Sequence, residues 1–507
     1  MSIAELLRYH AVATPEATAL QYRGHSLSYA QVQAAVEGFA AGAAQLRLSK
    51  QARVALLLPN CPPFVIAYFG CNRAGFTVVP LNVLYRPDEA RYILADSAVE
   101  ALVTTESFRP LLQALRPHLP RLTTVIMVAD DAVHQDEIDF RALCVTPAHK
   151  ARSMTAQDIA VILYTSGTTG RPKGAMLTNA NLLTNARACT RVLSVDANDC
   201  FLSALPLFHA FAATVTMLLP ILVGGRIVLM ERFVPMHTLQ LIGETGVTIF
   251  AGVPSMFSLL LQLPPDNRPS LETLRICVSG GAPLPTEVWT AFEQTYGACM
   301  AEGYGLTEAA PVVSVNPPFG LRKVGSIGPP LPGVTVKLID ARGRITPTGD
   351  VGELCVRGPN VMKGYLHQKT ESRKILRGGW LHTGDLARQD GDGYLYIVGR
   401  KKELIIVGGL NVYPGEVERV LLEHPAVLEA VAYGVADPSR GEAVWAAVVL
   451  HPAAVTTDRE LQMHCRDKLA NYKVPRGIDL RTELPKNALG KVQRHLLHEE
   501  TMQHLNV

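Results

Sequence analysis

The sequence contains no Cys-x-x-Cys pair, and its nine cysteines are scattered along 507 residues. Closely spaced cysteine pairs are typical of structural zinc sites and of the disulfide frameworks of small secreted domains. Their absence disfavours both classes, and isolated thiols suit a reducing cytosol. We therefore predict a cytoplasmic protein.

A concentration of charge of one sign is also missing. The formal net charge is only +3 and no basic block occurs, so the sequence lacks the electrostatic footprint of a nucleic-acid-binding protein. It has no low-complexity segment and no clear internal repeat. With 48% hydrophobic and 18% charged residues, the composition is typical of a globular protein with ample core.

Little in the sequence resembles a leader peptide or a membrane span. Residues 1–14 lack a basic start followed by a long apolar core. Residues 200–225 contain no Asp, Glu, Lys or Arg. However, Pro206, His209 and Pro220 interrupt this stretch, whereas a span needs about 20 largely uninterrupted apolar residues. We interpret the stretch as buried core and a pocket wall.

Short apolar runs alternate with helical patterns through the first 300 residues or so. This alternation predicts mostly parallel sheets covered by helices on both faces, and 507 residues are too many for one compact core. A capping-box signal, Ser28-x-x-Gln31, predicts a helix that ends near Leu46. The other predicted helices are 62–72, 179–193, 238–244, 254–262 and 285–296, and the predicted strands are 54–58, 76–80, 102–104, 125–128, 159–163, 227–230, 247–251 and 276–279.

The pattern changes after residue 304. Between residues 325 and 399 glycines are frequent and the predicted strands are short, which indicates an antiparallel arrangement. A third pattern begins near residue 400, where Thr457-x-x-Glu460 is another capping-box signal. The predicted fold class is therefore α/β: a large N-terminal domain of mostly parallel sheets covered by helices, with a small antiparallel β subdomain, followed by a small α+β C-terminal domain.

The stretch YTSGTTGRPKGAMLT, residues 164–178, concentrates hydroxyl groups, glycines and one lysine. The hydroxyl donors are Thr165, Ser166, Thr168 and Thr169. Gly167, Gly170 and Gly174 allow backbone conformations that a Cβ atom resists, and Lys173 adds a positive charge. The combination predicts a flexible loop that binds a polyphosphate.

This loop is not a Walker-type P-loop, which requires Gly, four residues and then Gly-Lys-Ser/Thr. Here Pro172 precedes the lysine and Gly174 follows it. Residues 165–174 instead resemble the signature loop of the adenylate-forming (ANL) enzymes, which include acyl-CoA and aryl-CoA ligases, firefly luciferase and the adenylation domains of nonribosomal peptide synthetases. The resemblance implies that the loop binds the β- and γ-phosphates of ATP.

A second motif, EGYGLTE at residues 302–308, resembles the family's next nucleotide motif in the form typical of acyl-CoA ligases. Glu308 offers carboxylate oxygens to Mg²⁺, a hard cation that also takes phosphate oxygens. Thr307 offers a donor to a phosphate, and Tyr304 offers a flat face to a base. The resemblance assigns Gly303 and Tyr304 to nucleotide binding, and Thr307 and Glu308 to catalysis, with Glu308 as the metal ligand.

Two turn-like segments gain a role only through the resemblance. SGGAPLP, residues 279–285, places Gly280, Gly281 and Ala282 beside adenine and the acyl site. LHTGDLA contains Asp385, which is expected to accept ribose hydroxyls as the acidic residue of dinucleotide sites does. Without the family context, both segments are ordinary turns.

The segment GRKKELIIVGGLNVYPGEVE lies where the pattern changes. The resemblance implies that Arg400 binds the ribose and that Lys401 is the hinge of a mobile small domain. Gly408 and Gly409 are expected at the channel for the acceptor thiol.

PKNALGKVQR, near the C-terminus, contains Lys491, which matches the family's catalytic lysine. A lysine in a polar C-terminal loop is otherwise a solvated side chain. The resemblance thus predicts an N-terminal adenylation domain at 1–399 for ATP and the acyl substrate, a hinge at 400–401, and a mobile C-terminal domain at 402–507 that carries the catalytic lysine.

His209 lies in PLFHAF, residues 206–211. A lone histidine among apolar residues is more often a core residue than a functional one, whereas in the family a histidine or aromatic residue here gates the acyl pocket. Members that activate amino acids place an aspartate in this region, so His209 disfavours an amino acid substrate.

The motifs occur in family order across residues 160–495, which implies an AMP-forming acyl-CoA synthetase that uses ATP, Mg²⁺ and coenzyme A. We expect a medium- or long-chain fatty acid, because residues 210–223 and 280–283 offer no cation to a second carboxylate. An aryl-CoA ligase and a ligase that loads an acyl carrier protein stay open as alternatives. Retention of Lys491 and Glu308 disfavours a sensor that has lost catalysis. No nucleic-acid partner is expected, and the protein is a monomer or a homodimer.

Overall fold

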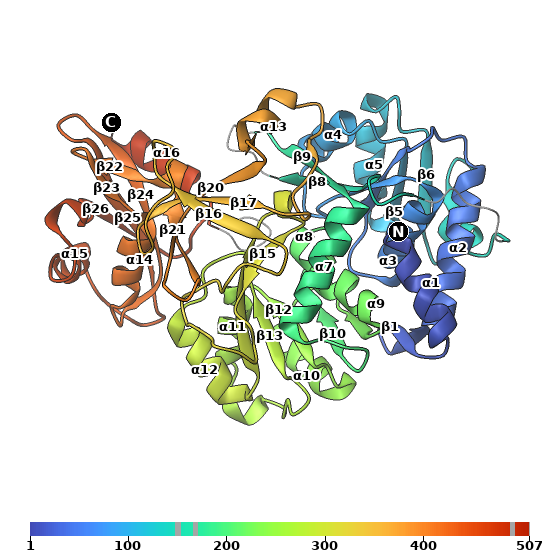
Figure 1. Cartoon of the computed structure of the whole chain (residues 1–507), viewed down its shortest axis with the longest axis horizontal. Helices are drawn as coiled ribbons and strands as arrows, with labels where there is room; N and C mark the ends of the chain where they lie inside the picture. The colour runs from blue at the N-terminus through green and yellow to red at the C-terminus, as the bar shows by residue number, and fades with distance from the viewer. Residues whose placement is uncertain (148–153, 166–170, 487–491, 506–507) are drawn as a thin grey trace. The chain divides into compact units, whose positions relative to one another are not determined.

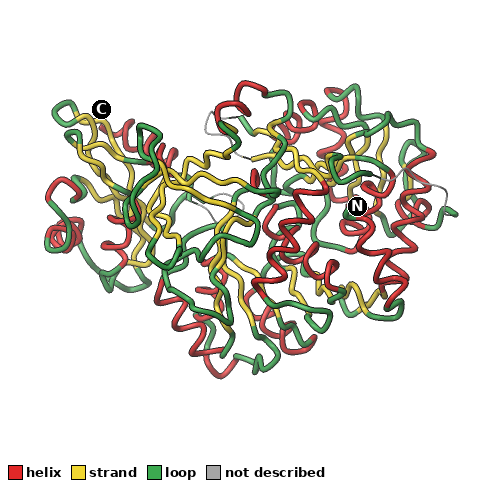
Figure 2. Tube along the Cα trace, in the orientation of Figure 1, coloured by secondary structure: helices red, strands yellow, loops and turns green. Residues whose placement is uncertain are grey.

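The computed structural model describes residues 1–147, 154–165, 171–486 and 492–505, and the chain divides into two compact units (Figures 1 and 2). Unit 1 comprises Met1–Val336 and Val356–Leu381, and unit 2 comprises Lys337–Cys355 and His382–Val507. The predicted hinge at 400–401 lies within unit 2, and its role stays a prediction.

The first sheet of unit 1 contains β1 (Thr18–Tyr22), β2 (His25–Ser28), β10 (Cys200–Ser203), β11 (Arg226–Leu229), β12 (Ile249–Gly252), β13 (Ile276–Ser279), β14 (Cys299–Gly305) and β15 (Val312–Val315). The strand order is β15-β14-β13-β12-β10-β11-β1-β2. Pairs between β14 and β1 are parallel, whereas β15 and β2 join antiparallel at the two edges. The carboxyl ends of β10, β13 and β14 therefore meet at one edge of the sheet.

The second sheet contains β3 (Arg53–Leu57), β4 (Thr77–Pro80), β5 (Ala101–Thr105), β6 (Thr124–Val128), β7 (Ile138–Asp139), β8 (Ile159–Thr165), β9 (Lys173–Thr178) and β18 (Gly364–Tyr365). Its strand order is β18-β9-β8-β4-β3-β5-β6-β7. β9 runs antiparallel to both β8 and β18, and the other pairs are parallel. Together the two sheets confirm the predicted mostly parallel architecture.

Helices surround both sheets (Figure 1). They are α1 (Ala4–Ala13), α2 (Tyr29–Gln45), α3 (Pro62–Ala74), α4 (Pro87–Asp96), α5 (Arg109–Leu115), α6 (Phe140–Cys144), α7 (Asn179–Leu193), α8 (Ala210–Ala212), α9 (Leu219–Val223), α10 (Pro235–Thr245), α11 (Pro254–Leu261), α12 (Thr286–Tyr296) and α13 (Lys369–Ile375). α1, α2 and α3 pack on one another. The capping box at Ser28 and Gln31 forms as predicted. One hydrophobic core joins buried residues of both sheets.

The charge-poor stretch forms β10, α8, one π-helical segment (Ala213–Leu218) and α9. Val215, Met217 and Leu219 are at most 1% exposed, which confirms the interpretation as buried core. Within the described part of the chain, no helix is long and apolar enough to cross a membrane.

A smaller sheet contains β16 (Thr335–Ile339), β17 (Gly352–Arg357), β19 (Leu376–Arg377), β20 (Trp380–Gln389) and β21 (Leu395–Arg400). Its order is β16-β17-β20-β19, and β21 pairs with β20. The pairs of β20 with β19 and with β21 are antiparallel. The division between the two units runs through β16, β17 and β20.

The rest of unit 2 contains β22 (Ile405–Val407), β23 (Leu410–Val412), α14 (Pro414–Leu422), β24 (Val427–Asp437), β25 (Gly441–Leu450), α15 (Asp458–Arg466), β26 (Gly477–Arg481) and α16 (Arg494–Leu505). The sheet order is β23-β22-β25-β24, with β26 beside β25. Thr457 and Glu460 form the second predicted capping box. This arrangement confirms the predicted α+β C-terminal part.

Candidate functional site

Three predicted motifs meet at one edge of the first sheet, because each follows or ends a parallel strand. His209 lies in the segment after β10, Gly280 follows β13, and Tyr304 lies near the end of β14. A Cβ atom on Gly280 would lie 3.3 Å from the ring of Phe211 and 3.5 Å from the carbonyl oxygen of Gly303. Ligands of open α/β sheets bind at the carboxyl ends of strands, so this edge is the candidate site of unit 1.

The side chain of Glu308 is held by two hydroxyl groups. Thr307 and Glu308 begin a short 3-10 turn, η5 (Thr307–Ala309). Tyr365 donates a 2.6 Å hydrogen bond to Oε1 of Glu308, and Thr165 donates a 3.4 Å hydrogen bond to the same oxygen. Thr165 ends β8, so the carboxylate joins the predicted phosphate-binding segment to the end of β14.

The segment predicted as a flexible loop at residues 164–178 is largely a β-hairpin. β8 continues to Thr165 and β9 begins at Lys173, and these two residues pair in the ladder. The prediction was therefore wrong for 173–178, because Ala175 and Leu177 are fully buried and β9 is paired on both sides. Ser166, Gly167, Thr168 and Thr169 lie outside the described residues, and their phosphate-binding role stays a prediction.

Lys173 is buried and already has an anionic partner. Its Nζ atom donates a 2.7 Å hydrogen bond to Oε2 of Glu371, a residue of α13. The hydrogen bond from Lys173, followed by that from Lys374, lowers the pKa of Glu371 to about 2. The same ammonium lies 5.5 Å from the centre of the Tyr365 ring. Because Glu371 already pairs with the ammonium, a phosphate that reaches Lys173 competes with Glu371.

His209 caps the short helix α8. Its Nδ1 atom accepts a 3.3 Å hydrogen bond from the backbone N–H of Phe211. Burial lowers the pKa of His209 to about 4, so the ring is neutral at pH 7. His209 thus fixes the backbone of the residue whose ring lies against Gly280, and its gating role stays a prediction.

The SGGAPLP segment forms an exposed turn above a buried carboxyl group. Gly281 has φ = +84°, a conformation that favours glycine, and Ala282 is exposed. Leu284 donates a 2.9 Å backbone hydrogen bond to Oε1 of Glu302, which is only 3% exposed. Burial raises the pKa of Glu302 to about 7, and the bond from Leu284 lowers it only in part. Glu302 has no predicted role of its own.

In unit 2, the two predicted ribose ligands lie together. Asp385 and Arg400 pair across β20 and β21, and Nε of Arg400 lies 3.0 Å from Oδ1 of Asp385. Asp385 is 5% exposed, whereas the side chain of Arg400 is 39% exposed. The pair combines acceptor oxygens with a cation, as ribose hydroxyls and a nearby phosphate require.

The predicted hinge and acceptor-channel residues are close in sequence to this pair. Lys401 begins the 3-10 turn η6 (Lys401–Glu403), and its Nζ atom lies 3.0 Å from Oε2 of Glu353. Gly408 and Gly409, with φ of +57° and +82°, form the two-residue turn between β22 and β23, the conformation of a tight hairpin. Lys491 lies outside the described residues, so its catalytic role stays a prediction.

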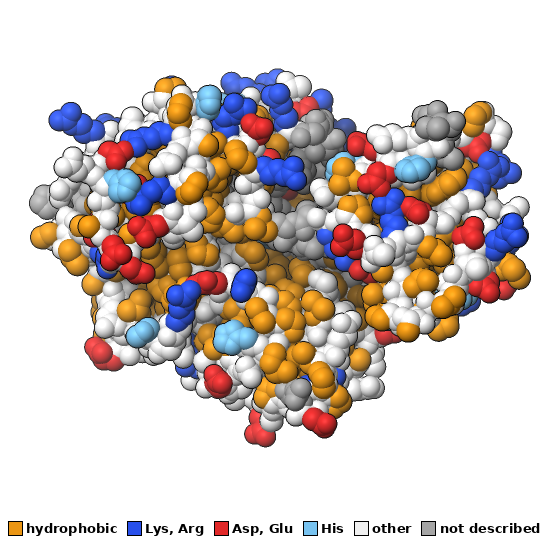
Figure 3. All heavy atoms as spheres, turned by 180° about the vertical axis from the view of Figure 1, so that it is seen from behind, with side chains coloured by type: hydrophobic (Ala, Val, Ile, Leu, Met, Phe, Trp, Pro, Cys, Tyr) orange, Lys and Arg blue, Asp and Glu red, His pale blue; other side chains and the backbone are white. Residues whose placement is uncertain are grey.

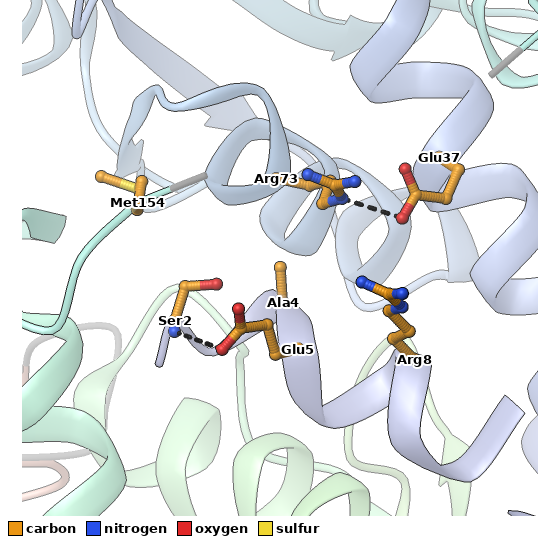
Figure 4. Close-up of a pocket in the computed structure, with 7 residues that line it drawn as sticks. All are labelled: Ser2, Ala4, Glu5, Arg8, Glu37, Arg73 and Met154. Atoms are coloured by element: carbon orange, nitrogen blue, oxygen red, sulfur yellow. Dashed lines mark hydrogen bonds and ion pairs between the residues drawn. The ribbon is translucent and has the colours of Figure 1, made fainter. Parts of the chain in front are cut away.

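A separate cavity of about 70 Å³ lies among α1, α2 and α3 (Figure 4). It is lined by Ser2, Ala4, Glu5, Arg8, Glu37, Arg73 and Met154. Nε of Arg73 lies 2.8 Å from Oε1 of Glu37, and Oε2 of Glu5 accepts a hydrogen bond from the backbone N–H of Ser2. None of the predicted site residues that the structure describes lines the cavity. On the face in Figure 3, charged side chains of both signs are interspersed.

Tyr365 and Glu371 were not predicted from the sequence. Tyr365 lies in the two-residue edge strand β18, and Glu371 follows this strand, in a segment without any recognised motif. The pairing of β18 with β9 brings that segment to the strand that begins with Lys173. An aromatic residue after a glycine is no specific signal. The register of a two-residue strand is set by tertiary packing and cannot be predicted from local periodicity.

Three loops follow or end parallel strands at the carboxyl edge of the first sheet, and a carboxylate and a buried lysine lie at the end of the β8–β9 hairpin of the second sheet. This is the arrangement of an α/β protein, a class that binds ligands at the carboxyl ends of its strands. The AMP-binding enzyme family model matches residues 7–366, and the AMP-binding enzyme C-terminal domain model matches residues 416–491. The chain therefore belongs to the AMP-binding enzyme family of adenylate-forming enzymes.

Similar proteins place it in the acyl-CoA synthetase branch. It is 37% identical over 534 residues to the long-chain-fatty-acid–CoA ligase of Bacillus subtilis (strain 168), covering 99% of this chain and 95% of that protein. Its fold matches the anthranilate CoA ligase AuaEII in complex with anthranoyl-AMP, with a TM-score of 0.93, 29% identity and coverage of 100% and 98%. It also matches the o-succinylbenzoate coenzyme A synthetase of Bacillus subtilis in complex with ATP and magnesium ion, with a TM-score of 0.85, 32% identity and coverage of 97% and 98%.

Proposed function

We propose that the protein is an ATP-dependent acyl-CoA synthetase. It activates a carboxylic acid as acyl-AMP with release of pyrophosphate, and then transfers the acyl group to the thiol of coenzyme A. The observation that carries the proposal is the anchored carboxylate of Glu308, held by Thr165 and Tyr365 at the end of the hairpin that carries Lys173. A phosphate-binding hairpin with an adjacent carboxylate is the donor set that a metal-bound nucleotide needs.

The first half-reaction joins two anions, so its barrier is largely one of charge and position. Lys173, together with the hydroxyl donors of the predicted loop, supplies positive charge and donors to the leaving pyrophosphate. Phe211 and Gly280, where an added Cβ atom would lie 3.3 Å from the ring of Phe211, shape the end of the site that receives the acid. His209 is neutral at pH 7, so it orients groups there without adding charge.

The residues around Glu308 fit a magnesium ion. Oε2 of Glu308 accepts no hydrogen bond within the described residues, and no cluster of three or more His, Cys, Asp or Glu side chains in that part of the chain could hold a metal alone. Mg²⁺ is commonly held by one or two carboxylates together with phosphates and water. A magnesium ion bound there would neutralise phosphate charge.

The second half-reaction requires the thiol to reach the acyl carbonyl, with AMP as the leaving group. In the account that the family resemblance suggests, the small domain rotates about Lys401 between the two half-reactions. The face that carries Gly408 and Gly409 then replaces, at the active site, the face that carries Lys491. Asp385 and Arg400 would hold the ribose. The 3.0 Å pairing of Asp385 and Arg400 supports the last assignment.

The acid is proposed to be a fatty acid with an apolar tail. The stretch that follows His209 is buried and lacks charge, so a second carboxylate would be unpaired there. An aryl acid is the alternative, favoured by the match to the anthranilate CoA ligase. Loading of an acyl carrier protein is the second alternative. A monomeric or homodimeric state and a cytoplasmic location stay part of the proposal.

The test is a screen of pyrophosphate release over fatty, aryl and dicarboxylic acids, with and without coenzyme A. AMP, and not ADP, is the expected nucleotide product. Because each buried methylene contributes about 0.8 kcal/mol, kcat/KM is expected to rise about fourfold per methylene until the pocket ends. Preference for an aryl acid would select the alternative, and preference for malonate over every fatty acid would contradict the proposal.

A further inference from the structure

Residues 361–372 form a strap on the edge of the second sheet. β18 pairs with β9 so that Tyr365 faces Ala175 in the ladder, and the backbone N–H of Leu366 donates a 2.8 Å hydrogen bond to the carbonyl of Gly174. The strap is therefore fixed to the strand that begins with Lys173.

The same strap also holds Glu308. The backbone N–H of Met362 donates a 2.9 Å hydrogen bond to the carbonyl oxygen of Glu308. Three residues further along, the hydroxyl of Tyr365 donates a 2.6 Å hydrogen bond to the carboxylate oxygen Oε1. The backbone and the side chain of Glu308 are thus anchored by one short segment.

The anchoring side chain is itself well fixed. Tyr365 is 9% exposed, and its backbone N–H donates a 2.8 Å hydrogen bond to Oγ of Ser372, the residue after Glu371. The ring lies 5.5 Å from the ammonium of Lys173, within the range of a cation–π contact. One tyrosine therefore contacts both of the charged side chains that the proposed function assigns to the metal and the phosphates.

We propose that Tyr365 is a positioning residue for metal-dependent nucleotide binding. Its hydroxyl occupies Oε1 of Glu308 and leaves Oε2 for the cation. The inference rests on the proposed function, because it takes Glu308 as the magnesium ligand. Groups that hydrogen-bond a metal-ligating carboxylate fix its orientation, and their loss typically weakens metal binding about 10- to 100-fold.

A purely structural role for Tyr365 makes a different prediction. Tyr365→Phe keeps the ring, and with it the contact to Lys173, and removes only the hydroxyl. If the hydroxyl merely stabilised the strap, the variant would melt at a lower temperature while its magnesium dependence stayed unchanged. If the hydroxyl positions Glu308, the magnesium dependence changes and the affinity for metal-free ATP does not.

The experiment is isothermal titration calorimetry of ATP into the full-length protein at a series of magnesium chloride concentrations, without acid or coenzyme A, so that no turnover occurs. Tyr365→Phe is expected to raise the magnesium concentration for half-maximal enhancement of ATP binding about tenfold. Thr165→Val, which removes the longer 3.4 Å bond to the same oxygen, is expected to raise it less. Tyr296→Phe, which removes a 3.2 Å bond to the carbonyl of Leu260, is the matched control and is expected to behave as the parent protein.

A double-mutant cycle with Glu308→Gln tests whether the tyrosine acts through the carboxylate. In the Glu308→Gln background, Tyr365→Phe is expected to add no further shift, because the group that it positions is already gone. If Glu308→Gln raises the magnesium concentration for half-maximal enhancement of ATP binding and Tyr365→Phe does not, this inference is overturned and the proposed function stands. No shift in either variant removes Glu308 as metal ligand, and a larger shift in Thr165→Val than in Tyr365→Phe also contradicts the inference.

Discussion

Lys173 and Glu371 are 198 residues apart in the sequence, yet the ammonium and the carboxylate lie 2.7 Å apart. The side chain of Lys173 is 8% exposed, and a charge so buried is costly unless it has a partner. Glu371 supplies that partner from α13. In the proposed function the phosphates of ATP are a second anion for the same ammonium, so the two anions compete.

The first prediction concerns this competition. Glu371→Gln is expected to lower the melting temperature of the nucleotide-free protein, because Lys173 loses its anionic partner. The same variant is expected to bind ATP more tightly and to show a larger ATP-induced rise in melting temperature than the parent protein, since a ligand stabilises by RT ln(1 + [L]/Kd). Differential scanning fluorimetry with and without ATP measures both effects.

A matched control comes from the other cation on Glu371. Lys374 also bonds this carboxylate, but its side chain is 66% exposed. Lys374→Gln is therefore expected to leave the melting temperatures without ATP and with ATP nearly unchanged. An ATP-induced rise in Glu371→Gln equal to that of the parent protein would show that Lys173 does not face the phosphates.

The second prediction concerns the pH dependence of stability through Glu302. Its pKa is about 7 in the folded protein against an ordinary value of 4.5, so between these values the folded state holds a proton that the unfolded state has lost. Stability therefore falls as pH rises from about 4.5 to 7 and levels off above pH 7. The shift corresponds to at most about 3 kcal/mol.

Glu302→Gln removes the titration and keeps an oxygen that accepts the N–H of Leu284. The melting temperature of the variant minus that of the parent protein is expected to increase between pH 5 and pH 7.5 and then to stay constant. The titratable groups on the elements around Glu302 are Cys277 on β13, Cys299 and Tyr304 on β14, and Glu287, Glu293 and Tyr296 on α12. A difference that does not vary with pH would show that Glu302 titrates normally.

Local signals predicted the helices and strands of the fold well. The capping residues Ser28 and Thr457 begin helices because each side chain satisfies a backbone donor of the first turn. Helix α7 and strand β13 have the predicted bounds, because apolar periodicity and flanking turn residues coincide there. The edge strand β18 has only two residues and no periodicity, so its pairing with β9 follows from tertiary packing alone.

The site was predicted less completely than the fold. Motifs identified Glu308, Asp385 and Arg400, and the structure brings the last two together through the register of β20 and β21. The partners of Glu308 and Lys173 were not predictable, because Tyr365 and Glu371 reach them across long sequence separations. Lys173 was predicted to lie in a loop, since glycines and hydroxyl residues resemble a turn, but pairing of β9 on both edges overrode this local preference.

The third prediction concerns His209. In the proposed function, the neutral His209 ring, which caps α8 and accepts the N–H of Phe211, lies at the end of the site that receives the acid. His209→Ala is therefore expected to raise KM for the acid and to leave the Kd for ATP unchanged. Its pKa is lowered by burial to about 4, so the unfolded chain gains a proton below about pH 6.5 while the folded protein does not. Stability attributable to His209 is therefore lost as pH falls from about 6.5 to 4.

Steady-state kinetics with the preferred acid and calorimetry with ATP separate these effects. His209→Gln keeps a polar acceptor but does not titrate, and it is expected to lose less stability than the parent protein between pH 6.5 and pH 4.5. A rise in the Kd for ATP as large as the rise in KM for the acid would place His209 at the nucleotide and contradict the assignment.

The last prediction concerns the division of labour between the two half-reactions. Lys491 is expected to act only while the acid and the α-phosphate react, so Lys491→Ala should lose about 10²- to 10³-fold in acyl-AMP formation. It should still convert supplied acyl-AMP and coenzyme A to thioester. Lys401→Pro should do the reverse, because proline fixes φ and obstructs a rotation at this residue.

Lys401 also bonds Glu353 at 3.0 Å, so loss of this ion pair must be separated from loss of rotation. Lys401→Met removes the charge and keeps a free backbone, and it is expected to retain both half-reactions, whereas only the proline variant should fail in thioester formation. Pyrophosphate release reports the first half and consumption of synthetic acyl-AMP reports the second. Equal damage to both halves in Lys491→Ala, with an unchanged circular dichroism spectrum, would refute domain alternation for this protein. If Lys401→Met failed as Lys401→Pro does, the bond to Glu353 and not the rotation would be the cause.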